Sequence, residues 1–562
     1  MLSRRDFVQV AGAAASLAGA GALGRRAAAQ AISQDDLLRF QPLGQVTLLH
    51  FTDLHAQLVP LWFREPSVNL GVGESKGKPP HLTEGALLAA YGLKPGSTDA
   101  YAFTSQDFAA LARHYGRIGG VDRLATLIKA VKAARPGRTL VLDGGDSWQG
   151  SYTALQTRGA DMVRAAQALG VEVMTGHWEF TYGQDRVKQL IAQLGFPFLA
   201  GNVRDATWQE DAFPGEARFE RGGVRIGVIG QAYPYTPVAN PRHLIPDWSF
   251  GINEERLARR VAAQRAAGAD LVVLLSHNGF DIDRKLAGRV KGIDVILTGH
   301  THDALPDVVK VGRTLLVASG SHGKFLARLD LEVKDKAIAD YRFRLIPVLA
   351  DAIRPDPETQ AVVTEIRSPH EAELGRVVGK AGGLLYRRGN FNGTFDDVIC
   401  RALIEERDAE IALSPGFRWG GSLLPGDDIR VEHIYDHTAI TYPAAYRSEM
   451  TGAALKDILE DVADNLFHPD PYYQQGGDMV RVGGLGYTID IARPMGSRIS
   501  GLTLLEDGSP VDAGRRYVVA GWASVAETTQ GPPIWDVVER YIARKQVVDA
   551  GGGAAHVKVV GG

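Results

Sequence analysis

The sequence predicts an α/β protein with two domains, and two observations support this prediction. The chain has 562 residues, which is more than a single hydrophobic core usually organises. Short apolar segments typical of buried strands alternate with amphipathic segments typical of helices, as in a layered α/β domain. The composition, 45% hydrophobic and 23% charged, is that of a globular protein.

The alternation extends from Val46 to about Pro347. The predicted strands are residues 46–51, 139–142, 171–174, 224–230, 271–276, 295–298 and 314–318. The predicted helices between them are residues 122–134, 184–194, 253–267 and 282–290. Residues 60 to about 116 interrupt this pattern with Pro, Gly and polar residues, and the segment is too long for a simple connection. We expect a functional insertion near the site, with a disordered surface loop as the alternative.

A second domain is predicted after residue 374. Its predicted helices are residues 395–406 and 453–466, and its predicted strands are 411–414, 486–491 and 517–520. The expected division is a signal peptide at 1–31, a catalytic domain at 32–350, a linker helix at 351–374 and a C-terminal domain at 375–562. The Gly-rich end, residues 551–562, is expected to be a loose tail.

The N-terminus has the pattern of an export signal. Ser3-Arg4-Arg5-Asp6-Phe7 precedes an uncharged Ala/Gly-rich stretch and the small residues Ala27-Ala28-Ala29, as in a twin-arginine signal peptide. An uncleaved anchor is the alternative, but Ala and Gly make a poor membrane span. We therefore predict a periplasmic protein that has no membrane association after signal cleavage.

Charge and cysteine content exclude several classes of site. A formal net charge of -3 disfavours a nucleic-acid-binding protein, which usually carries a basic excess. The single cysteine, Cys400, excludes internal disulfides and a thiolate-rich metal site. Because Cys400 falls in a predicted helix, we expect a buried small hydrophobic residue rather than a nucleophile.

Five polar motifs follow predicted strands and together predict a metal centre. They are Asp53-Leu54-His55, Gly145-Asp146-Ser147, Gly176-His177-Trp178-Glu179, Ser276-His277-Asn278 and Gly299-His300-Thr301-His302. Side chains beyond the carboxyl ends of neighbouring strands converge in open α/β sheets. Any one of these histidines alone would more often be structural, but five such motifs at strand ends favour metal ligands. Imidazole with carboxylate suits Zn, Mn or Fe rather than Mg or Ca alone.

The ordered set resembles the calcineurin-like metallophosphoesterases, specifically the 5′-nucleotidase branch. This resemblance implies a four-layer αββα catalytic domain followed by a C-terminal α/β substrate-binding domain. It also implies one ion on Asp53, His55 and His302, and a second on His277, His300 and His177. Asp146 would bridge the two ions and act as a catalytic residue, and a hydroxide shared by the ions would attack the substrate.

The third motif departs from the nucleotidase pattern Gly-Asn-His-Glu-Phe-Asp. His177 takes the place of the Asn ligand, Trp178 replaces the catalytic His, and Thr181 replaces its Asp. An alkoxide leaving group needs such an acid, typically worth about 10²–10⁴-fold in rate, whereas a thiolate or persulfide is stable near neutral pH. In this the chain resembles the thiosulfohydrolases of the bacterial sulfur-oxidation (Sox) system.

That resemblance implies two Mn²⁺ ions, with Zn²⁺ or Fe possible, and hydrolysis of a sulfonate from a cysteine S-thiosulfonate on the SoxYZ carrier protein. Other sulfur-oxidation components are expected partners. A periplasmic 5′-nucleotidase or nucleotide-sugar phosphohydrolase is the alternative. A non-catalytic metal-binding or carrier-docking protein is disfavoured because the ligand set is complete.

Candidate substrate residues lie mostly in the second domain. Arg418, in Ser414-Pro415-Gly416-Phe417-Arg418-Trp419, matches the nucleotidase segment whose Arg binds substrate, and its planar donors suit sulfonate oxygens. An interface salt bridge is an equal alternative for Arg418. Trp178, Tyr472 and Tyr473 are further candidates for lining the substrate cleft, although core or surface packing is the commoner role of such rings.

Overall fold

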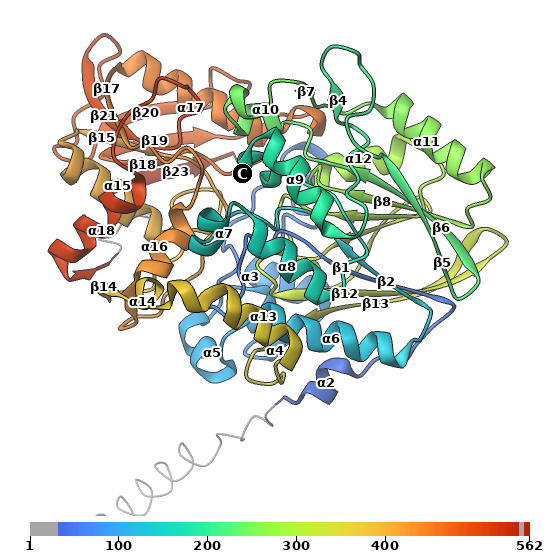
Figure 1. Cartoon of the computed structure of the whole chain (residues 1–562). Coiled ribbons are helices and arrows are strands. Elements are labelled where there is room, and N and C mark those ends of the chain that lie inside the picture. Colours follow the sequence, from blue (N-terminus) through green and yellow to red (C-terminus); the bar gives the residue numbers. More distant parts are fainter. Residues whose placement is uncertain (1–31, 550–555, 562) are drawn as a thin grey trace, which may run out of the picture.

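The computed structural model describes residues 32–549 and 556–561. The predicted signal peptide at 1–31 lies outside the described residues. Two α/β parts lie side by side in the fold (Figure 1), and the site lies where they meet.

The N-terminal part contains two β-sheets. The first has the order β13-β12-β1-β2-β3, and the second has the order β10-β11-β9-β8-β6-β5. The strands of the first sheet are β1 (Val46–Phe51), β2 (Thr139–Asp143), β3 (Val173–Met174), β12 (Phe325–Lys334) and β13 (Ala337–Pro347). Those of the second are β5 (Glu216–Arg221), β6 (Val224–Gln231), β8 (Leu271–Ser276), β9 (Val295–Thr298), β10 (Val309–Val311) and β11 (Thr314–Ala318). A two-stranded sheet, β4 (Arg204–Asp205) with β7 (Trp248–Ser249), lies apart from both.

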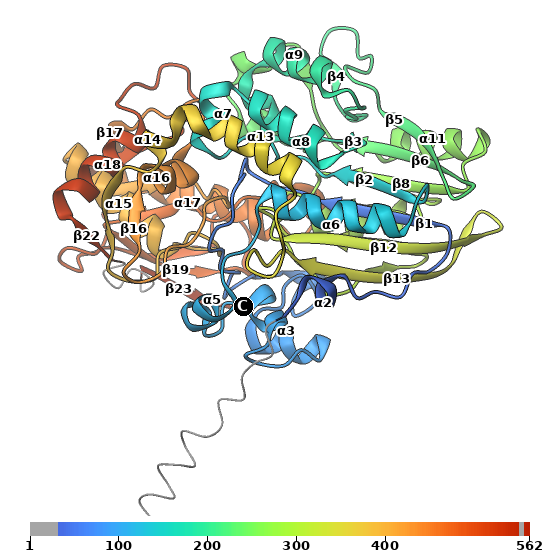
Figure 2. The ribbon, with the colours of Figure 1, turned by 60° about the horizontal axis from the view of Figure 1, so that its bottom comes forward.

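The two sheets pack face to face, with helices on their outer faces. Leu48, Leu140 and Val173 of the first sheet share one buried cluster with Val228 and Val273 of the second. The helices α6 (Val121–Ala134), α8 (Ala160–Leu169) and α9 (Gln184–Leu194) belong to the first side, where Figure 2 shows α6 lying along the sheet. The helices α11 (Glu254–Ala266) and α12 (Phe280–Arg289) cover the second sheet. The layers are therefore αββα, which confirms the predicted fold class.

Smaller helical elements connect these layers. They are α2 (Gln34–Leu38), α7 (Tyr152–Thr157), η2 (Trp178–Tyr182), α10 (Thr236–Ala239) and η3 (Arg242–Leu244). Each predicted strand of this domain corresponds to an observed strand, with ends that shift by at most a few residues.

The insertion is folded rather than a plain loop. It contains η1 (Gly73–Ser75), α3 (Glu84–Tyr91), α4 (Thr98–Phe103) and α5 (Phe108–Tyr115). It also touches both domains: Trp62 forms an isolated β-bridge with Ser422, and His81 Nε2 contacts Asp281 Oδ2 at 2.7 Å. The insertion is thus part of the interface between the domains.

The C-terminal part is a second α/β unit. Its strands are β14 (Val377–Ala381), β15 (Ile411–Ser414), β16 (Asp428–Arg430), β17 (Tyr446–Thr451), β18 (Arg481–Gly483), β19 (Leu485–Asp490), β20 (Ile499–Leu504), β21 (Arg516–Gly521), β22 (Val547–Val548) and β23 (Val557–Val560). Its helical elements are α15 (Thr394–Arg407), α16 (Val431–Thr438), α17 (Gly452–Phe467), η5 (Pro471–Tyr473) and α18 (Ile534–Lys545). The connection between the two parts contains α13 (Pro357–Arg367), η4 (Ser368–His370) and α14 (Glu371–Leu374).

One expectation about this part is wrong. The end of the chain is not entirely a loose tail, because β23 pairs in parallel with β19. No helix of the described residues, 32–549 and 556–561, has the length and apolarity that a membrane span requires.

Candidate metal centre

The fold brings the five motifs to one edge, where the two sheets meet. β1, β2 and β3 are parallel neighbours in the first sheet, and Asp53, Asp146 and His177 follow their carboxyl ends. β8 and β9 are parallel neighbours in the second sheet, and His277 and His300 follow theirs. Because the carboxyl ends of parallel strands face the same edge, residues far apart in sequence meet there.

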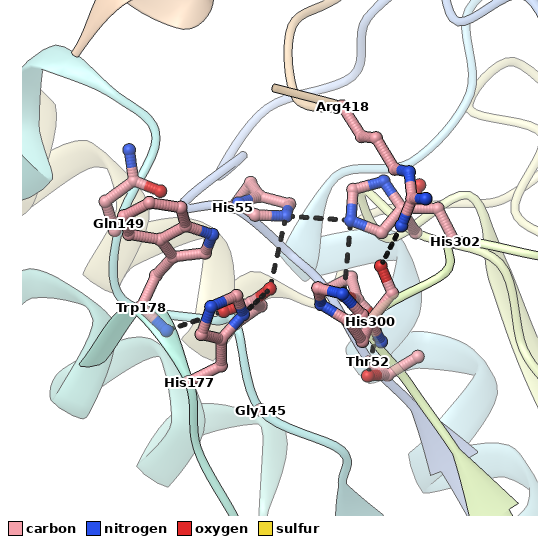
Figure 3. Close-up of polar contacts among 12 residues, drawn as sticks. Thr52, His55, Gly145, Gln149, His177, Trp178, His300, His302 and Arg418 are labelled. Carbon is pink, nitrogen blue, oxygen red and sulfur yellow. Dashed lines mark hydrogen bonds and ion pairs between the residues drawn. The ribbon is translucent and has the colours of Figure 1, made fainter. Parts of the chain in front are cut away.

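The seven predicted ligands form two groups that share one carboxylate. Asp146, His177, His277 and His300 form one group, and Asp53, His55, Asp146 and His302 form the other. Within each group the potential ligand atoms all lie within 4.8 Å of one another. Figure 3 shows His55, His177 and the neighbouring His300 and His302 converging from three separate segments. Asp146 is the residue common to both groups, and its bridging of two ions stays a prediction.

The donor atoms of this cluster fit a pair of divalent cations. His55 Nε2 and His302 Nε2 are 3.0 Å apart, and His277 Nε2 lies 3.0 Å from Asp146 Oδ2. All seven side chains are buried, and within residues 32–549 and 556–561 the ring nitrogens His177 Nε2 and His300 Nε2 have no hydrogen-bond partner. Buried polar atoms are normally satisfied, so a crowded set of unsatisfied imidazoles points to cations as the missing partners.

The backbone of the motifs is unusual for residues with side chains. Asp53, His55, Asp146, His300 and His302 all have positive φ, between 45° and 73°. This left-handed conformation is uncommon outside glycine, although Asp and His adopt it more readily than most residues. Such conformations persist where the surrounding structure imposes them, and they concentrate at functional sites.

Hydrogen bonds behind the ligands fix their orientation. His277 Nδ1 lies 2.6 Å from the Gly144 carbonyl oxygen, which holds that nitrogen protonated and directs Nε2 into the site. Asp53 accepts hydrogen bonds from the Thr52 hydroxyl at 2.6 Å and from the His300 backbone N–H at 3.1 Å. The Trp178 backbone N–H donates to Asp146 Oδ1 at 2.7 Å.

Glu179 ties two ligand-bearing loops together. Its fully buried carboxylate accepts backbone N–H bonds from His177 at 2.7 Å and Asp146 at 3.2 Å through Oε2. Through Oε1 it accepts those of Ser147 at 2.7 Å and Trp148 at 3.3 Å. Burial raises the pKa of Glu179, while these N–H donors favour its charged form. Glu179 belongs to the third motif, but no role was predicted for it.

The protonation equilibria show how strongly these groups interact. Burial raises the pKa of Asp53 to about 8. Burial also acts on Asp146, but the imidazoles of His177 and His277 outweigh it and hold the Asp146 pKa well below its usual range. For His277, burial is opposed by Asp146 and Asp53, and the net effect raises its pKa to about 10. Carboxylates and imidazoles that interact this strongly at short range are groups whose charges a pair of cations would balance.

A cavity of about 280 Å³ opens onto this cluster between the two domains. Five of the predicted ligands line it: His55, Asp146, His177, His300 and His302. The rest of its wall is largely apolar or glycine, from Trp178 and Val238 on the N-terminal side to Phe417, Trp419 and Val480 on the C-terminal side.

Comparisons with known proteins agree with this architecture. The family model for the 5′-nucleotidase C-terminal domain matches residues 377–538. The 5′-nucleotidase of Bos taurus is 25% identical over 447 residues, covering 72% of this chain and 75% of that protein. The structure of a 5′-nucleotidase precursor from Thermus thermophilus superposes with a TM-score of 0.72 at 22% identity, covering 92% of this chain and 100% of that one.

A closer match is the structure described as the sulfate thiohydrolase SoxB of Thermus thermophilus in complex with glycerol. It superposes with a TM-score of 0.90 at 38% identity, and the match covers 93% of this chain and 98% of that one. The chain belongs to the SoxB family. It is a SoxB-like hydrolase with a buried candidate site for two metal ions.

In this SoxB-family chain, the position of the nucleotidase catalytic His is part of an aromatic wall. The Trp178 ring packs edge-on against Phe417 and Trp419, with centroids 5.4 and 5.1 Å away, and only 5% of Trp178 is exposed. Thr181, at the position of the nucleotidase Asp, has no charge. Its hydroxyl is hydrogen-bonded to the Thr441 hydroxyl at 2.7 Å. The acid–base pair of the nucleotidase pattern is therefore replaced by packing and an interdomain hydrogen bond.

Arg418 lies beside the ligands, as Figure 3 shows, but its donors have partners in the protein. Nη1 donates to the His300 carbonyl at 3.1 Å, Nη2 donates to the Gly477 carbonyl, and Nε faces Asp478 Oδ1 at 3.4 Å. Arg418 lines the cavity and joins the C-terminal domain to the metal loop. Its role toward a sulfonate stays a prediction.

The two candidate tyrosines lie away from the cavity wall. The Tyr472 hydroxyl donates to Glu254 Oε1 at 2.6 Å and its ring lies under Lys285, while Tyr473 is 62% exposed. Neither is among the residues that line the metal cavity.

Two aromatic residues near the ligands were not predicted. The Tyr233 ring stacks on His300 at a centroid distance of 4.1 Å, and its hydroxyl donates to the Gln475 carbonyl of the other domain. His322 lies behind His55, with ring centroids 5.4 Å apart, and its Nε2 accepts the Gly420 backbone N–H at 3.3 Å. Tyr233 comes just after β6, and this position at a strand end could have predicted that it lies near the ligands.

Proposed function

We propose that this protein is a periplasmic thiosulfohydrolase that removes the terminal sulfonate from a cysteine S-thiosulfonate on the SoxYZ carrier and releases sulfate. Two findings support the proposal: the 38% identity to a protein described as a sulfate thiohydrolase, and the replacement of the nucleotidase acid at Trp178. Manganese is the proposed metal, and the twin-arginine pattern at the N-terminus supports the proposed compartment.

The proposed reaction breaks the bond between the sulfane sulfur and the sulfonate sulfur. Water adds to the sulfonate sulfur, the electron pair of the broken bond leaves with the sulfane sulfur, and the products are a cysteine persulfide, sulfate and two protons. Two divalent ions held by the seven ligands would supply a nucleophile from water at neutral pH and stabilise charge on the sulfonate oxygens.

The observation that carries the proposal is the lack of a free acid in the described wall of the cavity. Apart from the predicted ligands, its ionisable lining residues are Tyr233, Arg418 and Asp478. The Tyr233 hydroxyl is held by the Gln475 carbonyl and burial raises its pKa, while Asp478 pairs with Arg481 at 2.8 Å. A departing alkoxide would find no ready proton donor there, whereas a persulfide needs none.

The chain's own groups account for substrate placement in this proposal. The aromatic wall of Trp178, Phe417 and Trp419 excludes water and suits the uncharged part of a carrier segment. Arg418 stands next to His300, where its guanidinium charge favours an anionic sulfonate.

The test is a comparison of substrates on one preparation. The mature, manganese-loaded protein is incubated with thiosulfonate-loaded SoxYZ, with unloaded SoxYZ and with AMP, and sulfate and phosphate are measured by ion chromatography. We expect sulfate only from the loaded carrier and little phosphate from AMP. Efficient release of phosphate without release of sulfate would replace this proposal by the 5′-nucleotidase that the curated relatives represent.

A further inference from the structure

A second cavity lies behind His300, on the side of the insertion. Its volume is about 70 Å³, and three parts of the chain line it. The insertion contributes Asn69 and His81, the N-terminal domain contributes the beginning of α12, and the C-terminal domain contributes Arg388 and Asn390.

Arg388 is a buried cation without a close ion pair; the carboxylate whose charge it acts on is that of Asp303. Arg388 is only 7% exposed, and within the described residues no carboxylate oxygen lies within ion-pair distance of its guanidinium. One Nη2 donor reaches the Thr301 carbonyl at 3.1 Å, while Nε is buried without any partner. A buried charge is costly unless it is paired and hydrogen-bonded, so the unpartnered Nε of Arg388 favours binding of a small anion beside it.

The same cavity receives the positive end of a helix. Residues 279–282, at the start of α12, line it, and no side chain caps this N-terminus. The first N–H groups of a helix have no acceptor inside the helix, and together with the helix dipole they favour an anion. The backbone N–H groups of the helix end and the guanidinium of Arg388 thus both face the same small cavity.

The carboxylates around the cavity have other partners. Asp281 contacts His81 at 2.7 Å, Asp478 contacts Arg481 at 2.8 Å, and Asp303 accepts the Asn69 amide at 3.1 Å. Among the described residues none of these carboxylates lies within ion-pair distance of Arg388, although Asp303 feels its charge from farther away.

The second cavity adjoins the metal cavity. His300, Arg418 and residues 476–478 line both, so this short segment is the partition between them. Gly476 has φ +75°, and a Cβ at this position would collide with His300 Nε2, so the backbone lies directly on the ligand's ring. An anion in the second cavity would thus be separated from the metal cavity only by this segment.

We propose that this second cavity is a binding site for a small tetrahedral oxyanion such as sulfate, held by Arg388 and the N-terminus of α12. The binding itself is independent of the reaction. Its role as a place that receives the released oxyanion rests on the proposed function.

The test is a crystal of the manganese-loaded holoenzyme soaked in selenate, a sulfate analogue that the anomalous signal of selenium locates. We expect a selenate within hydrogen-bond distance of Arg388 and the start of α12, separate from any selenate at the metal ions. Arg388→Gln should lose that site and keep the one at the metals, and Arg388→Lys should weaken it. Arg39→Gln, which removes the same charge from a side chain that is 80% exposed, should keep both sites.

Several results would overturn the proposal. One is a wild-type crystal in which only water lies between Arg388 and Asp303 while selenate occupies the metal site. Another is a selenate that remains beside position 388 in Arg388→Gln. If that variant does not fold, the wild-type soak decides alone. Because the soak requires no turnover, its failure is distinguishable from failure of the proposed hydrolase activity.

Discussion

Glu179→Gln tests whether one buried carboxylate holds the metal loops in place. Each carboxylate oxygen accepts two backbone N–H groups, Oε2 from His177 and Asp146 and Oε1 from Ser147 and Trp148. A glutamine keeps one oxygen, so in either orientation its NH₂ group faces two N–H donors. Hydrogen bonds to charged groups contribute about 1.5–3 kcal/mol each, and losing two should cost about 3–6 kcal/mol. That is a large part of the roughly 5–15 kcal/mol by which proteins are usually stable.

The assay is urea unfolding together with metal analysis of Glu179→Gln. The matched control is Glu255→Gln, because the Glu255 side chain is 89% exposed and lies far from the site in α11. We expect a lower unfolding midpoint and reduced metal content in Glu179→Gln only, since His177 and Asp146 lose their common anchor. Equal midpoints and equal metal content in the two variants would refute this reasoning.

Three further predictions concern single side chains. His177→Ala should lower the metal content toward one ion per chain by elemental analysis, and two retained ions would contradict its place in the ligand set. Thr181→Val should cost about 1 kcal/mol through the lost bond to Thr441, while sulfate release stays unchanged; a loss of sulfate release in folded protein would mean that Thr181 acts in catalysis. Burial raises the pKa of the Cys400 thiol well above its usual value, so it should resist a thiol reagent at pH 8 until urea unfolds the chain. Rapid labelling of the native protein would show that this part of α15 opens.

The sequence predicted the candidate metal ligands well, because their motifs lie directly after apolar strands. The ligand motifs come directly after apolar strands such as β1 and β8, so their convergence followed from the geometry of parallel sheets. β12 was not predicted because its apolar pattern contains Arg328 and Asp330. These two charges are buried and paired at 3.1 Å, and Asp330 also accepts the Thr47 hydroxyl at 2.8 Å, so the strand is buried in spite of them.

The rest of the site depends on contacts that no local pattern encodes. Tyr233 stacks on His300 within the N-terminal domain, but the bond from its hydroxyl to Gln475 of the other domain joins residues 242 positions apart. Tyr472 was predicted to line the substrate cleft, but its hydroxyl donates a hydrogen bond to Glu254 of α11 instead. Arg388 lay next to no recognised motif, and its burial with an unpartnered Nε is a property of the folded interface alone.

The central claim is that two metal ions act on a sulfonate linked through sulfur. The most direct measurement is a titration of metal-depleted protein with Mn²⁺, in which bound metal per chain and sulfate release from thiosulfonate-loaded SoxYZ are measured at each point. The account predicts that sulfate release rises with the second equivalent and reaches its maximum at two ions per chain. Full sulfate release with one ion per chain, or none with two ions bound, would contradict it.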